Sequence, residues 1–517
     1  MDIESWENSL VLLKGIVGDG EVRQTHASVV LMQDEFVYKI KKPVDFGFLD
    51  YRSLQQRRTY SILEKELNER YSDDVYVDVL KLVPVAGGAY ALVPIANTVP
   101  AVEYVLKMRR VAEDKFLSTR IDSTTGEELK RIGGEVARRL SVASVAPDVI
   151  EGLPIYESIT FNCKENFSQI ADTEPKLGEK LVDERLRYIE KATNDFLTAN
   201  KDLFNRRYTG GFVKDGHGDL RLEHIYIGND GKISLIDCIE FNTRFRTNDV
   251  TAEAAFLSME LDYAGKIGLS DAFLGGFFDF YNDKDSISLL NFYRAYRAVV
   301  RAKVAAFTML GCGRDNPLYA DKYAEYNRLM DMAVTYALTM NSVCPLVLFG
   351  IIGAGKSELA KALAERFPVQ CINTDEVRKG LAGKPADYNG VVAANEGLYT
   401  QERTIATYNK LGEIVADALK VARLPLCDGT FLKTANVKAF EEQLTSVTPI
   451  YIEVRADENI IKERLKVRES SGGVSDGRLQ HYETLKNSRD YNTSDLTIDG
   501  ALPAATSVAT LLKFLLK

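Results

Sequence analysis

The sequence predicts two successive folding units of different class: an α+β unit of two lobes, followed by an α/β unit with a mainly parallel five-stranded sheet. Three observations support this prediction. Strand-like runs dominate residues 22–95, helical periodicity then continues to about residue 340, and strands alternate with helices from residue 346 onward. We therefore expect a small lobe at 1–97, a larger helical lobe at 98–341 and an α/β domain at 344–517.

Composition limits the class of protein. The chain has 517 residues, of which 45% are hydrophobic and 27% charged, as is usual for a globular protein with several cores. Its formal net charge of −9 argues against general binding to nucleic acids or membrane surfaces. The six cysteines are scattered without metal-binding spacing, which favours small buried residues in a reducing compartment. With no basic leader and no long apolar run, we expect a cytoplasmic protein.

The first lobe carries two lysines on one face of a predicted strand. Residues 36–44 read FVYKIKKPV, and Val37, Lys39 and Lys41 point to the same side of such a strand. A lysine on an inner face is costly unless it meets an opposite charge. In kinase folds a strand lysine of this kind meets the nucleotide phosphates, so we expect Lys39 to bind the nucleotide, with Lys41 as the runner-up. The alternative is a solvated pair of edge-strand lysines.

A polar helix predicted over residues 50–71 supplies the opposite charge. Glu64 and Glu66 both lie on it, and either one can pair with the strand lysine. Strands predicted at 75–83 and 89–95 complete the small lobe. Beyond them, residues 101–210 are mostly helical in pattern.

A predicted hairpin at 217–241, HGDLRLEHIYIGNDGKISLIDCIEF, carries two carboxylates at one end. Asp219 precedes its first strand, Asp237 follows its second, and the glycine-rich turn at 228–231 tolerates positive φ. Phosphoryl transfer needs such a pair, because one carboxylate orients the attacking hydroxyl and takes its proton while the other holds Mg²⁺. The alternative is a hairpin with two exposed turn acids.

A second phosphate-binding motif begins the α/β domain. The strand-like run at 346–349 leads into GIIGAGKS at 350–357 and then an amphipathic helix, which is G-x-x-x-x-G-K-[ST] in its proper context. Backbone N–H groups of such a loop cradle phosphates, its lysine reaches the β- and γ-phosphates, and its serine binds Mg²⁺. The nucleotide-binding residues expected here are Gly350, Gly353, Ala354, Gly355, Lys356, Ser357 and Glu358.

Further charged residues follow the next strands of this domain. Asp375 and Arg378 come after a second predicted strand, where they are placed to accept a hydroxyl proton and to bind an anionic group of the acceptor. Asp428 ends a third strand and is a candidate Mg²⁺ ligand. Strands at 450–454 and 495–498 complete the sheet, and Arg464 and Arg468 share one face of a helix that can clamp phosphates.

The hairpin resembles the catalytic loop of the aminoglycoside phosphotransferase-like kinases, relatives of protein kinases, whose usual form is H-G-D-x-x-x-x-N before a strand that ends in I-D. The resemblance implies a structural role for His217, catalysis by Asp219, Mg²⁺ binding by Asp237, and a pair between Lys39 and Glu64.

His224 stands where that family has asparagine. Because Mg²⁺ prefers oxygen ligands and imidazole suits softer metals, either the second metal position is remodelled, with Glu240 helping, or the lobe is weakened.

The α/β domain resembles the polynucleotide-kinase-like and gluconate-kinase-like P-loop phosphotransferases, an AAA_33-type ATP-binding domain within the P-loop NTPases. The element T-D-x-V-R at 374–378 carries this likeness and implies acceptor roles for Asp375 and Arg378. It also implies Mg²⁺ binding by Asp428 and a phosphate clamp at Arg464 and Arg468. Blocks such as VYKIKKPV-x-FGFLDY make the whole chain similar to bifunctional proteins that fuse both kinase types.

These resemblances predict an ATP-dependent phosphotransferase with two nucleotide-binding sites, which uses ATP and Mg²⁺ and acts on hydroxyl groups of small molecules. One alternative is that the N-terminal half is a ligand-binding pseudokinase that regulates a C-terminal kinase or ATPase. Another is that the P-loop half is an ATPase switch, although Asp375 and Arg378 favour a kinase. A kinase of nucleic-acid ends fits the acidic charge less well. The substrates, the choice of ATP or GTP, the coupling of the sites and the oligomeric state stay open.

Overall fold

The computed structural model describes residues 6–340, 344–385, 388, 399–445, 447–471 and 479–517, and only the backbone of 468–471 and 479–481. Contacts divide the chain into two compact units. The first comprises Met1–Asn162, Lys201–Leu261 and Gly268–Asn282, and the second Cys163–Asn200, Asp262–Ile267 and Asp283–Lys517. The helical residues between the predicted boundaries at 97 and 341 are thus shared by both units, and those boundaries stay a prediction.

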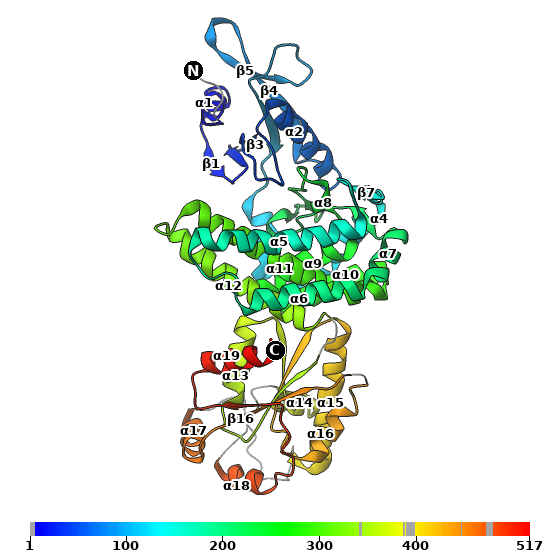
Figure 1. The fold of residues 1–517 in the computed structure, drawn as a ribbon, viewed down its shortest axis with the longest axis vertical. Coiled ribbons are helices and arrows are strands. Elements are labelled where there is room, and N and C mark those ends of the chain that lie inside the picture. The colour runs from blue at the N-terminus through cyan, green and yellow to red at the C-terminus, as the bar shows by residue number, and fades with distance from the viewer. Residues whose placement is uncertain (1–5, 341–343, 386–387, 389–398, 446, 472–478) are drawn as a thin grey trace. The chain divides into compact units, whose positions relative to one another are not determined.

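A six-stranded antiparallel sheet begins the first unit, in the spatial order β1-β2-β3-β6-β4-β5. Figure 1 shows it in blue beside helix α2. One of its central strands, β6, lies beyond residue 97, because the chain returns to pair between β3 and β4. The strands are β1 (Glu21–Gln24), β2 (Ser28–Met32), β3 (Phe36–Lys41), β4 (Tyr76–Pro84), β5 (Tyr90–Pro94) and β6 (Glu103–Arg109).

Alternation along β2 and β3 explains how this sheet buries its core. Leu31, Tyr38 and Ile40 pack with Leu13 of α1 (Trp6–Val17), so the apolar residues of each strand face the helix. Helix α2 (Leu54–Glu69) starts at a capping box in which Ser53 and Gln56 exchange hydrogen bonds.

The rest of the first unit is mainly helical with small two-stranded sheets. Helices α4 and α10 approach so closely that a Cβ on Gly133 would lie 2.0 Å from the carbonyl oxygen of Phe273. The remaining strands are β7 (Val149–Ile150), β8 (Leu153–Pro154), β9 (Val213–Asp215), β10 (Ile225–Ile227), β11 (Ile233–Leu235) and β12 (Thr247–Asp249). The helices are α3 (Leu117–Arg120), α4 (Gly126–Val142), α7 (Lys201–Thr209), α8 (Thr243–Arg246), and most of α9 (Val250–Tyr263) and α10 (Ile267–Tyr281), while α5 (Ile155–Leu177) runs into the second unit.

The hairpin predicted at 217–241 is present. Strands β10 and β11 pair antiparallel, with Ile225 opposite Leu235 and Ile227 opposite Ile233. All six of their residues are buried, so the hairpin is a core element whose register is fixed on both faces.

Three long helices of the second unit precede the α/β domain: α6 (Glu184–Ala199), α11 (Lys284–Cys312) and α12 (Pro317–Leu338), of which α11 and α12 contact it. Asp331 of α12 pairs with both Arg185 of α6 and Arg366 at the end of α13. The ion pair between Arg423 and Asp262 is almost fully buried, with an Nη1–Oδ2 distance of 2.6 Å.

The α/β domain is built on a five-stranded sheet in the order β14-β15-β13-β16-β17, in which every neighbouring pair is parallel. Figure 1 shows helices on both sides of it. Residues of α13 and α19 form one core layer, and residues of α15 and α16 form the other. The strands are β13 (Leu346–Phe349), β14 (Val369–Asn373), β15 (Leu424–Asp428), β16 (Ile450–Arg455) and β17 (Leu496–Asp499). The helices are α13 (Lys356–Arg366), α14 (Thr374–Leu381), α15 (Gln401–Lys420), α16 (Thr434–Glu441), α17 (Glu458–Ser471), α18 (Leu479–Asn487) and α19 (Ala504–Leu515).

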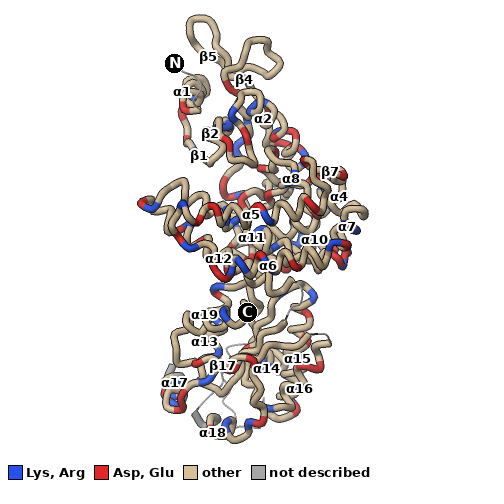
Figure 2. The backbone as a smooth tube through the Cα atoms, viewed as in Figure 1, with Lys and Arg blue, Asp and Glu red and all other residues tan. Residues whose placement is uncertain are grey.

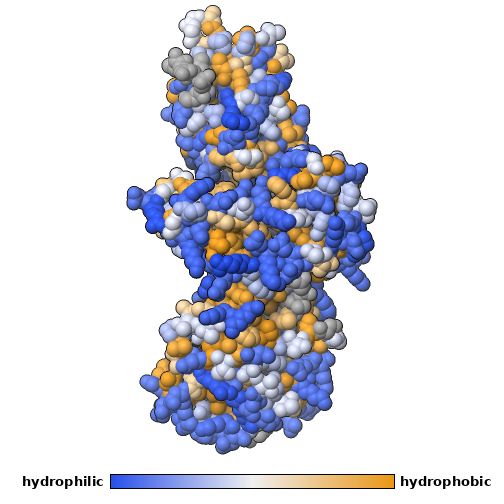
Figure 3. Space-filling model, viewed as in Figure 1, coloured by the Kyte–Doolittle hydropathy of each residue, from blue (hydrophilic) through white to orange (hydrophobic). Residues whose placement is uncertain are grey.

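These topologies confirm the predicted fold class. Antiparallel and parallel sheets occupy separate parts of the chain, as the change in sequence pattern near residue 346 predicted. Basic and acidic residues are interspersed along the backbone in Figure 2, and the face in Figure 3 is mainly hydrophilic with small hydrophobic patches. Within the described ranges, no helix has both the length and the apolar character that a membrane span requires.

Candidate functional site

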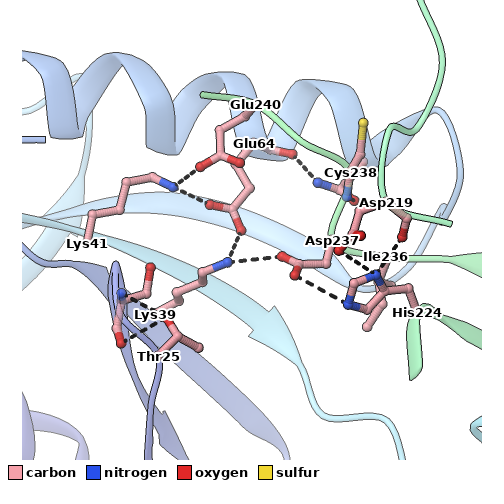
Figure 4. A network of polar contacts seen from close by, with 12 residues as sticks. Thr25, Lys39, Lys41, Glu64, Asp219, His224, Ile236, Asp237, Cys238 and Glu240 are labelled. Carbon is pink, nitrogen blue, oxygen red and sulfur yellow. Dashed lines mark hydrogen bonds and ion pairs between the residues drawn. The ribbon is translucent and has the colours of Figure 1, made fainter. Parts of the chain in front are cut away.

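The hairpin of the first unit brings Asp219 and Asp237 to one imidazole ring, that of His224 (Figure 4). His224 Nδ1 donates to the main-chain carbonyl of Asp219 at 2.8 Å, and Nε2 lies 3.6 Å from Asp237 Oδ2. A carbonyl oxygen can only accept, so Nδ1 carries a proton, and Nε2 faces the carboxylate of Asp237. The two acids therefore meet as the sequence predicted, across the residue that departs from the family pattern.

His217 holds the loop that carries Asp219 in place. Its Nε2 donates to the carbonyl of Ile236 at 2.9 Å, and its Nδ1 accepts from the N–H of Asp219 at 3.3 Å. Burial, reinforced by His224, lowers the pKa of His217 to about 4. The ring is therefore neutral at pH 7 and holds the loop against the strand that precedes Asp237.

Gly218 lets the loop pass close to another backbone segment. Its φ is +83°, and a Cβ there would lie 2.9 Å from the Cα of Arg246. Its N–H donates to Glu253 Oε1 at 2.7 Å. The positive φ and the close approach of Arg246 both require glycine at this position. Asp219 follows directly, so the conformation of Gly218 sets the direction of the chain at Asp219.

Asp237 has a left-handed backbone, with φ of +62°. Such a conformation is strained for a residue other than glycine and is frequent at functional sites. Its N–H donates to the hydroxyl of Tyr76 at 3.0 Å, and its side chain remains 48% exposed. The ammonium of Lys39 is the main cause that holds the pKa of Asp237 well below its usual range. Asp237 is therefore an ionised carboxylate that a ligand can reach.

Lys39 and Lys41 both contact Glu64, which identifies Glu64 rather than the exposed Glu66 as the helix partner. Lys39 Nζ lies 2.7 Å from Glu64 Oε1 and 3.2 Å from Asp237 Oδ1. Lys41 Nζ lies 2.6 Å from Glu64 Oε2. Of the two lysines, only Lys39 reaches the exposed carboxylate, as Figure 4 shows.

Lys41 belongs to a buried cluster behind the site. Its ammonium also contacts Glu240 and the hydroxyl of Tyr51, and that hydroxyl donates to Glu240. The side chains of Lys41, Glu64 and Glu240 are all less than a tenth exposed. Glu240 is thus held by a lysine on the side away from His224, and Tyr51 is a residue that the sequence did not reveal.

In the α/β domain, the loop at 350–357 adopts the conformation that its glycines allow. Gly350 has φ of +138°, and a Cβ there would lie 2.4 Å from the carbonyl oxygen of Val454. Gly353 and Gly355 also have positive φ. Helix α13 begins directly after Gly355, so the loop N–H groups gather at a helix N-terminus, where anions bind well.

Asp428 at the end of β15 meets the loop serine. Ser357 Oγ donates to Asp428 Oδ2 at 2.6 Å, and the side-chain amide of Asn373 donates to the same oxygen at 3.1 Å. Because β13, β14 and β15 are adjacent and parallel, their carboxyl ends converge at one edge of the sheet. Asn373 was not predicted; its place directly before T-D-x-V-R was the available signal.

Asp375 and Arg378 form a pair beside this loop. Arg378 Nη1 donates to Asp375 Oδ1 at 2.5 Å, and its guanidinium lies 4.6 Å from the ring centroid of Tyr399. Arg378 is 8% exposed, and its Nε has no hydrogen-bond partner among the described residues. An unpaired buried guanidinium nitrogen is costly, and an anionic ligand would satisfy it.

One cavity of about 1040 Å³ unites the predicted residues of this domain. The predicted residues that line it are Gly353, Gly355, Lys356, Ser357, Glu358, Asp375, Arg378, Asp428 and Arg464. Tyr399, Tyr408 and Lys433 line it as well and were missed, because nothing in their local sequence marks them. Gly350 and Ala354 support the loop from outside the cavity lining.

Arg464 projects toward the loop from α17. Its Nη2 donates to the carbonyl of Gly500 at 2.9 Å. The side chain of Arg468, one turn further along α17, lies outside the described residues.

The oxygen and nitrogen donors of the described residues decide whether a metal ion fits at each site. In the described part of the chain, no three His, Cys, Asp or Glu side chains converge on a point that would hold a metal ion. The oxygens of Ser357 and Asp428 nevertheless fit Mg²⁺, which takes few protein ligands beside nucleotide phosphates and water. Asp237 fits in the same way, whereas the imidazole of His224 is a poor ligand for Mg²⁺.

Comparisons with known proteins find similarity in both halves of the chain. Residues 346–490 match a family model described as an AAA domain. A protein of Mycobacterium tuberculosis, named there as uncharacterized, is 31% identical over 503 residues, which are 94% of each chain. The chain belongs to the family of this protein. Because the match covers 94% of each chain, that relative also carries the N-terminal half and the α/β domain in one polypeptide.

Two solved structures resemble the parts separately. A choline kinase from Streptococcus pneumoniae is 14% identical with a TM-score of 0.36, and the match covers 63% of this chain and 99% of that one. A gluconokinase from Sinorhizobium meliloti is 19% identical with a TM-score of 0.25, and the match covers 33% and 91%.

Proposed function

We propose that the chain is an ATP-dependent phosphotransferase with two nucleotide-binding sites, each of which transfers the γ-phosphate to a hydroxyl group of a small molecule. The observation that carries the proposal is the cavity of the α/β domain. There the phosphate-binding residues Lys356 and Ser357 share one space with Asp375 and Arg378. An ATPase switch has no need of a carboxylate and a buried, partly unpaired arginine at this place.

In the α/β domain, the loop N–H groups and Lys356 would bind and orient the nucleotide phosphates. Asp375 would accept the proton of the substrate hydroxyl, and the unpaired Nε of Arg378 would bind an anionic group of the same substrate. Arg464 would move from the carbonyl of Gly500 to the transferring phosphate. Mg²⁺, when bound by Ser357 and Asp428, would neutralise charge on the phosphates.

In the N-terminal site, Lys39 would bind phosphates while Glu64 holds its ammonium in place. Asp219 would orient the acceptor hydroxyl and take its proton. Asp237 would hold Mg²⁺, whose role is again to neutralise the phosphates. His224 remains a predicted ligand, although its imidazole suits softer ions than Mg²⁺.

The test follows labelled γ-phosphate from ATP into a pooled small-metabolite extract. We expect Asp219→Ala and Lys356→Ala each to abolish a different labelled product. The matched controls are Asp230→Ala, an acid in the turn of the same hairpin, and Lys361→Ala, an exposed lysine of α13. Unchanged transfer in Lys356→Ala would refute the proposed C-terminal site, and unchanged transfer in Asp219→Ala would refute the N-terminal one.

A second candidate is that the N-terminal half binds a ligand without transferring phosphate. The observation that favours it is the surroundings of Asp237, whose carboxylate lies 3.2 Å from Lys39 Nζ and 3.6 Å from His224 Nε2. Electron paramagnetic resonance of Mn²⁺ with the Lys356→Ala protein and ATP separates the two. Mn²⁺ binding that disappears in Asp237→Asn supports the kinase, and the absence of such binding supports the ligand-binding half.

A further inference from the structure

The first unit contains a second cavity, of about 750 Å³, that the proposed chemistry does not use. It lies where the end of α2, helices α4 and α10, and the turn of the β10–β11 hairpin meet. Its lining residues are Arg70, Asp73, Arg131, Gly134, Glu135, Arg138, Arg139, Gly231, Lys232, Ile233 and Phe280. None of the predicted catalytic, nucleotide-binding or metal-binding residues is among them.

Positive charge dominates the lining. Five cationic side chains face only two acidic ones, which gives a net charge of +3 at this point of a chain whose total is −9. Only Ile233 and Phe280 contribute large apolar side chains. The charged side chains of this lining therefore suit an anionic ligand.

Backbone carbonyls, which neutralise no charge, hold two of the arginines, whereas Arg138 pairs with Glu135, Lys232 with Asp73 and Arg70 with Asp215. Arg131 Nη2 donates to the carbonyl of Gly231 at 2.8 Å. Arg139 donates to the carbonyls of Arg70 and Ile233 at 3.3 and 2.9 Å, in addition to its ion pair with Glu135. The guanidinium groups are thus positioned before any ligand arrives, which reduces the entropy lost on binding.

The wall of the cavity is rigid because two helices are in backbone contact behind it. A Cβ on Gly276 of α10 would lie 1.8 Å from the carbonyl oxygen of Lys130 on α4. Gly134, also on α4, lines the cavity, and its missing side chain leaves space there. Such contact holds Arg131 and Arg138, on the same helix, at a fixed separation from the hairpin turn.

We propose that this cavity is a binding site for a small phosphorylated ligand, separate from both phosphoryl-transfer sites. Several arginines match the planar pairs of oxygens on phosphate groups, and a net charge of +3 exceeds what a single carboxylate would neutralise. A volume of about 750 Å³ accommodates a metabolite carrying one or two phosphates. The proposal concerns binding, so it holds whether or not the N-terminal site transfers phosphate.

The ligand would connect to the N-terminal site through the elements that surround it. Arg70 ends the helix that carries Glu64, and Ile233 begins the strand that leads to Asp237. Asn68 already joins these elements, since its amide oxygen accepts from the N–H of Cys238 at 2.9 Å. A ligand that spans Arg70 and Lys232 would hold the helix and the hairpin together and stabilise the Lys39–Glu64 arrangement.

Hydrogen–deuterium exchange of the full chain with inorganic pyrophosphate as the probe tests this site. The Lys356→Ala protein serves as background, so that the P-loop does not compete. We expect pyrophosphate to protect residues 126–142 and 228–235. In the triple variant Arg131→Gln, Arg138→Gln, Lys232→Gln, protection of these segments should require a concentration of pyrophosphate about tenfold higher or more. The reason is that the variant removes several charge-assisted contacts to the ligand.

A matched control removes three cations elsewhere: Lys191→Gln, Lys410→Gln and Lys420→Gln, which lie in exposed helix ion pairs. This control has the same net charge as the triple variant. Pyrophosphate should protect its residues 126–142 and 228–235 as strongly as it protects them in the Lys356→Ala protein. Equal protection in the triple variant, or no protection at millimolar pyrophosphate, would overturn the proposal. Protection by a short single-stranded oligonucleotide but not by pyrophosphate would replace the small ligand with a nucleic acid.

Discussion

At the scale of single residues, the N-terminal site depends on backbone positions that few side chains tolerate. Asp237 adopts φ of +62° and Gly218 adopts +83° on either side of the hairpin. Both hold their places because neighbouring groups fix them: Tyr76 accepts from the N–H of Asp237, and Glu253 accepts from that of Gly218. Strain is kept where the two acids must meet.

Gly218→Ala should lower the free energy of unfolding by about 2 kcal/mol more than Gly152→Ala. Gly152 has the same φ of +83°, but a Cβ there would have no atom within 4 Å, whereas at Gly218 it would meet Arg246. The conformational cost of a positive φ is therefore the same in both variants. The difference between their free energies of unfolding reports the steric cost of the clash with Arg246. Urea unfolding of both variants measures it, and equal losses would show that the loop moves away freely.

His217 makes stability depend on pH in a window set by its lowered pKa. The folded-state pKa is about 4 and the unfolded one about 6.5, so the unfolded chain binds the extra proton between these values. Stability is therefore complete above pH 6.5 and is lost as pH falls toward 4, by about 3 kcal/mol in full. His217→Gln should lack this component in urea titrations across the window. A wild-type curve no steeper than that of the variant would contradict the lowered pKa.

At the scale of elements, strand β3 and helix α2 divide two tasks between two lysines. Lys39 has Asp237 and the exposed site on one side, and Lys41 has Glu240 and Tyr51 in the buried cluster on the other. Both meet the two oxygens of Glu64. We therefore propose a binding role for Lys39 and a structural role for Lys41, two residues apart on the same strand.

Lys41→Met should lower the free energy of unfolding by about 3–5 kcal/mol, because it leaves Glu240 and part of Glu64 buried without a cation. Lys39→Met should cost about 1–2 kcal/mol, since Glu64 keeps Lys41 and Asp237 remains half-exposed. Nucleotide binding by the N-terminal site should disappear in Lys39→Met and persist in folded Lys41→Met. Calorimetric unfolding and ATP titration in the Lys356→Ala background measure both effects, and the reverse pattern would assign nucleotide binding to Lys41.

At the scale of the whole molecule, the second unit joins helices that precede residue 340 to the α/β domain. Arg423, directly before β15, pairs with Asp262, and the side-chain amide of Asn291 on α11 donates to the carbonyl of Ala422 at 2.8 Å. Ala422 has φ of +56°, so the segment before β15 adopts a special conformation at this contact. The strand that carries Asp428 is therefore anchored at its other end.

Asp262→Asn in the full chain should lower the free energy of unfolding of the second unit by about 3 kcal/mol, because it removes the negative charge that pairs with the buried guanidinium of Arg423. Asp195→Asn removes an exposed helix ion pair of the same unit and should change it by less than about 0.5 kcal/mol. Residues 344–517 expressed alone should melt below the full chain for the same reason. Differential scanning calorimetry measures all three, and an isolated domain as stable as the full chain would contradict the anchoring.

The sequence by itself determined much of this protein, because local patterns carry the information. Alternation and turn chemistry predicted the hairpin between Asp219 and Asp237, and the glycine loop between strand and helix predicted Lys356 and Ser357 at a phosphate site. The strands of both sheets were foreseen in the same way except β6, which lies in a stretch that was expected to be helical.

Tertiary structure alone decided which residues meet across distant segments. The choice of Glu64 over Glu66 required the burial of one face of α2, and the pairing of β6 between β3 and β4 required a return of the chain. Asn373, Tyr399 and the arginines of the second cavity gather from separate elements whose local sequences are ordinary. Sites are set by side chains that converge in space, and such convergence leaves no period or motif in a single stretch of sequence.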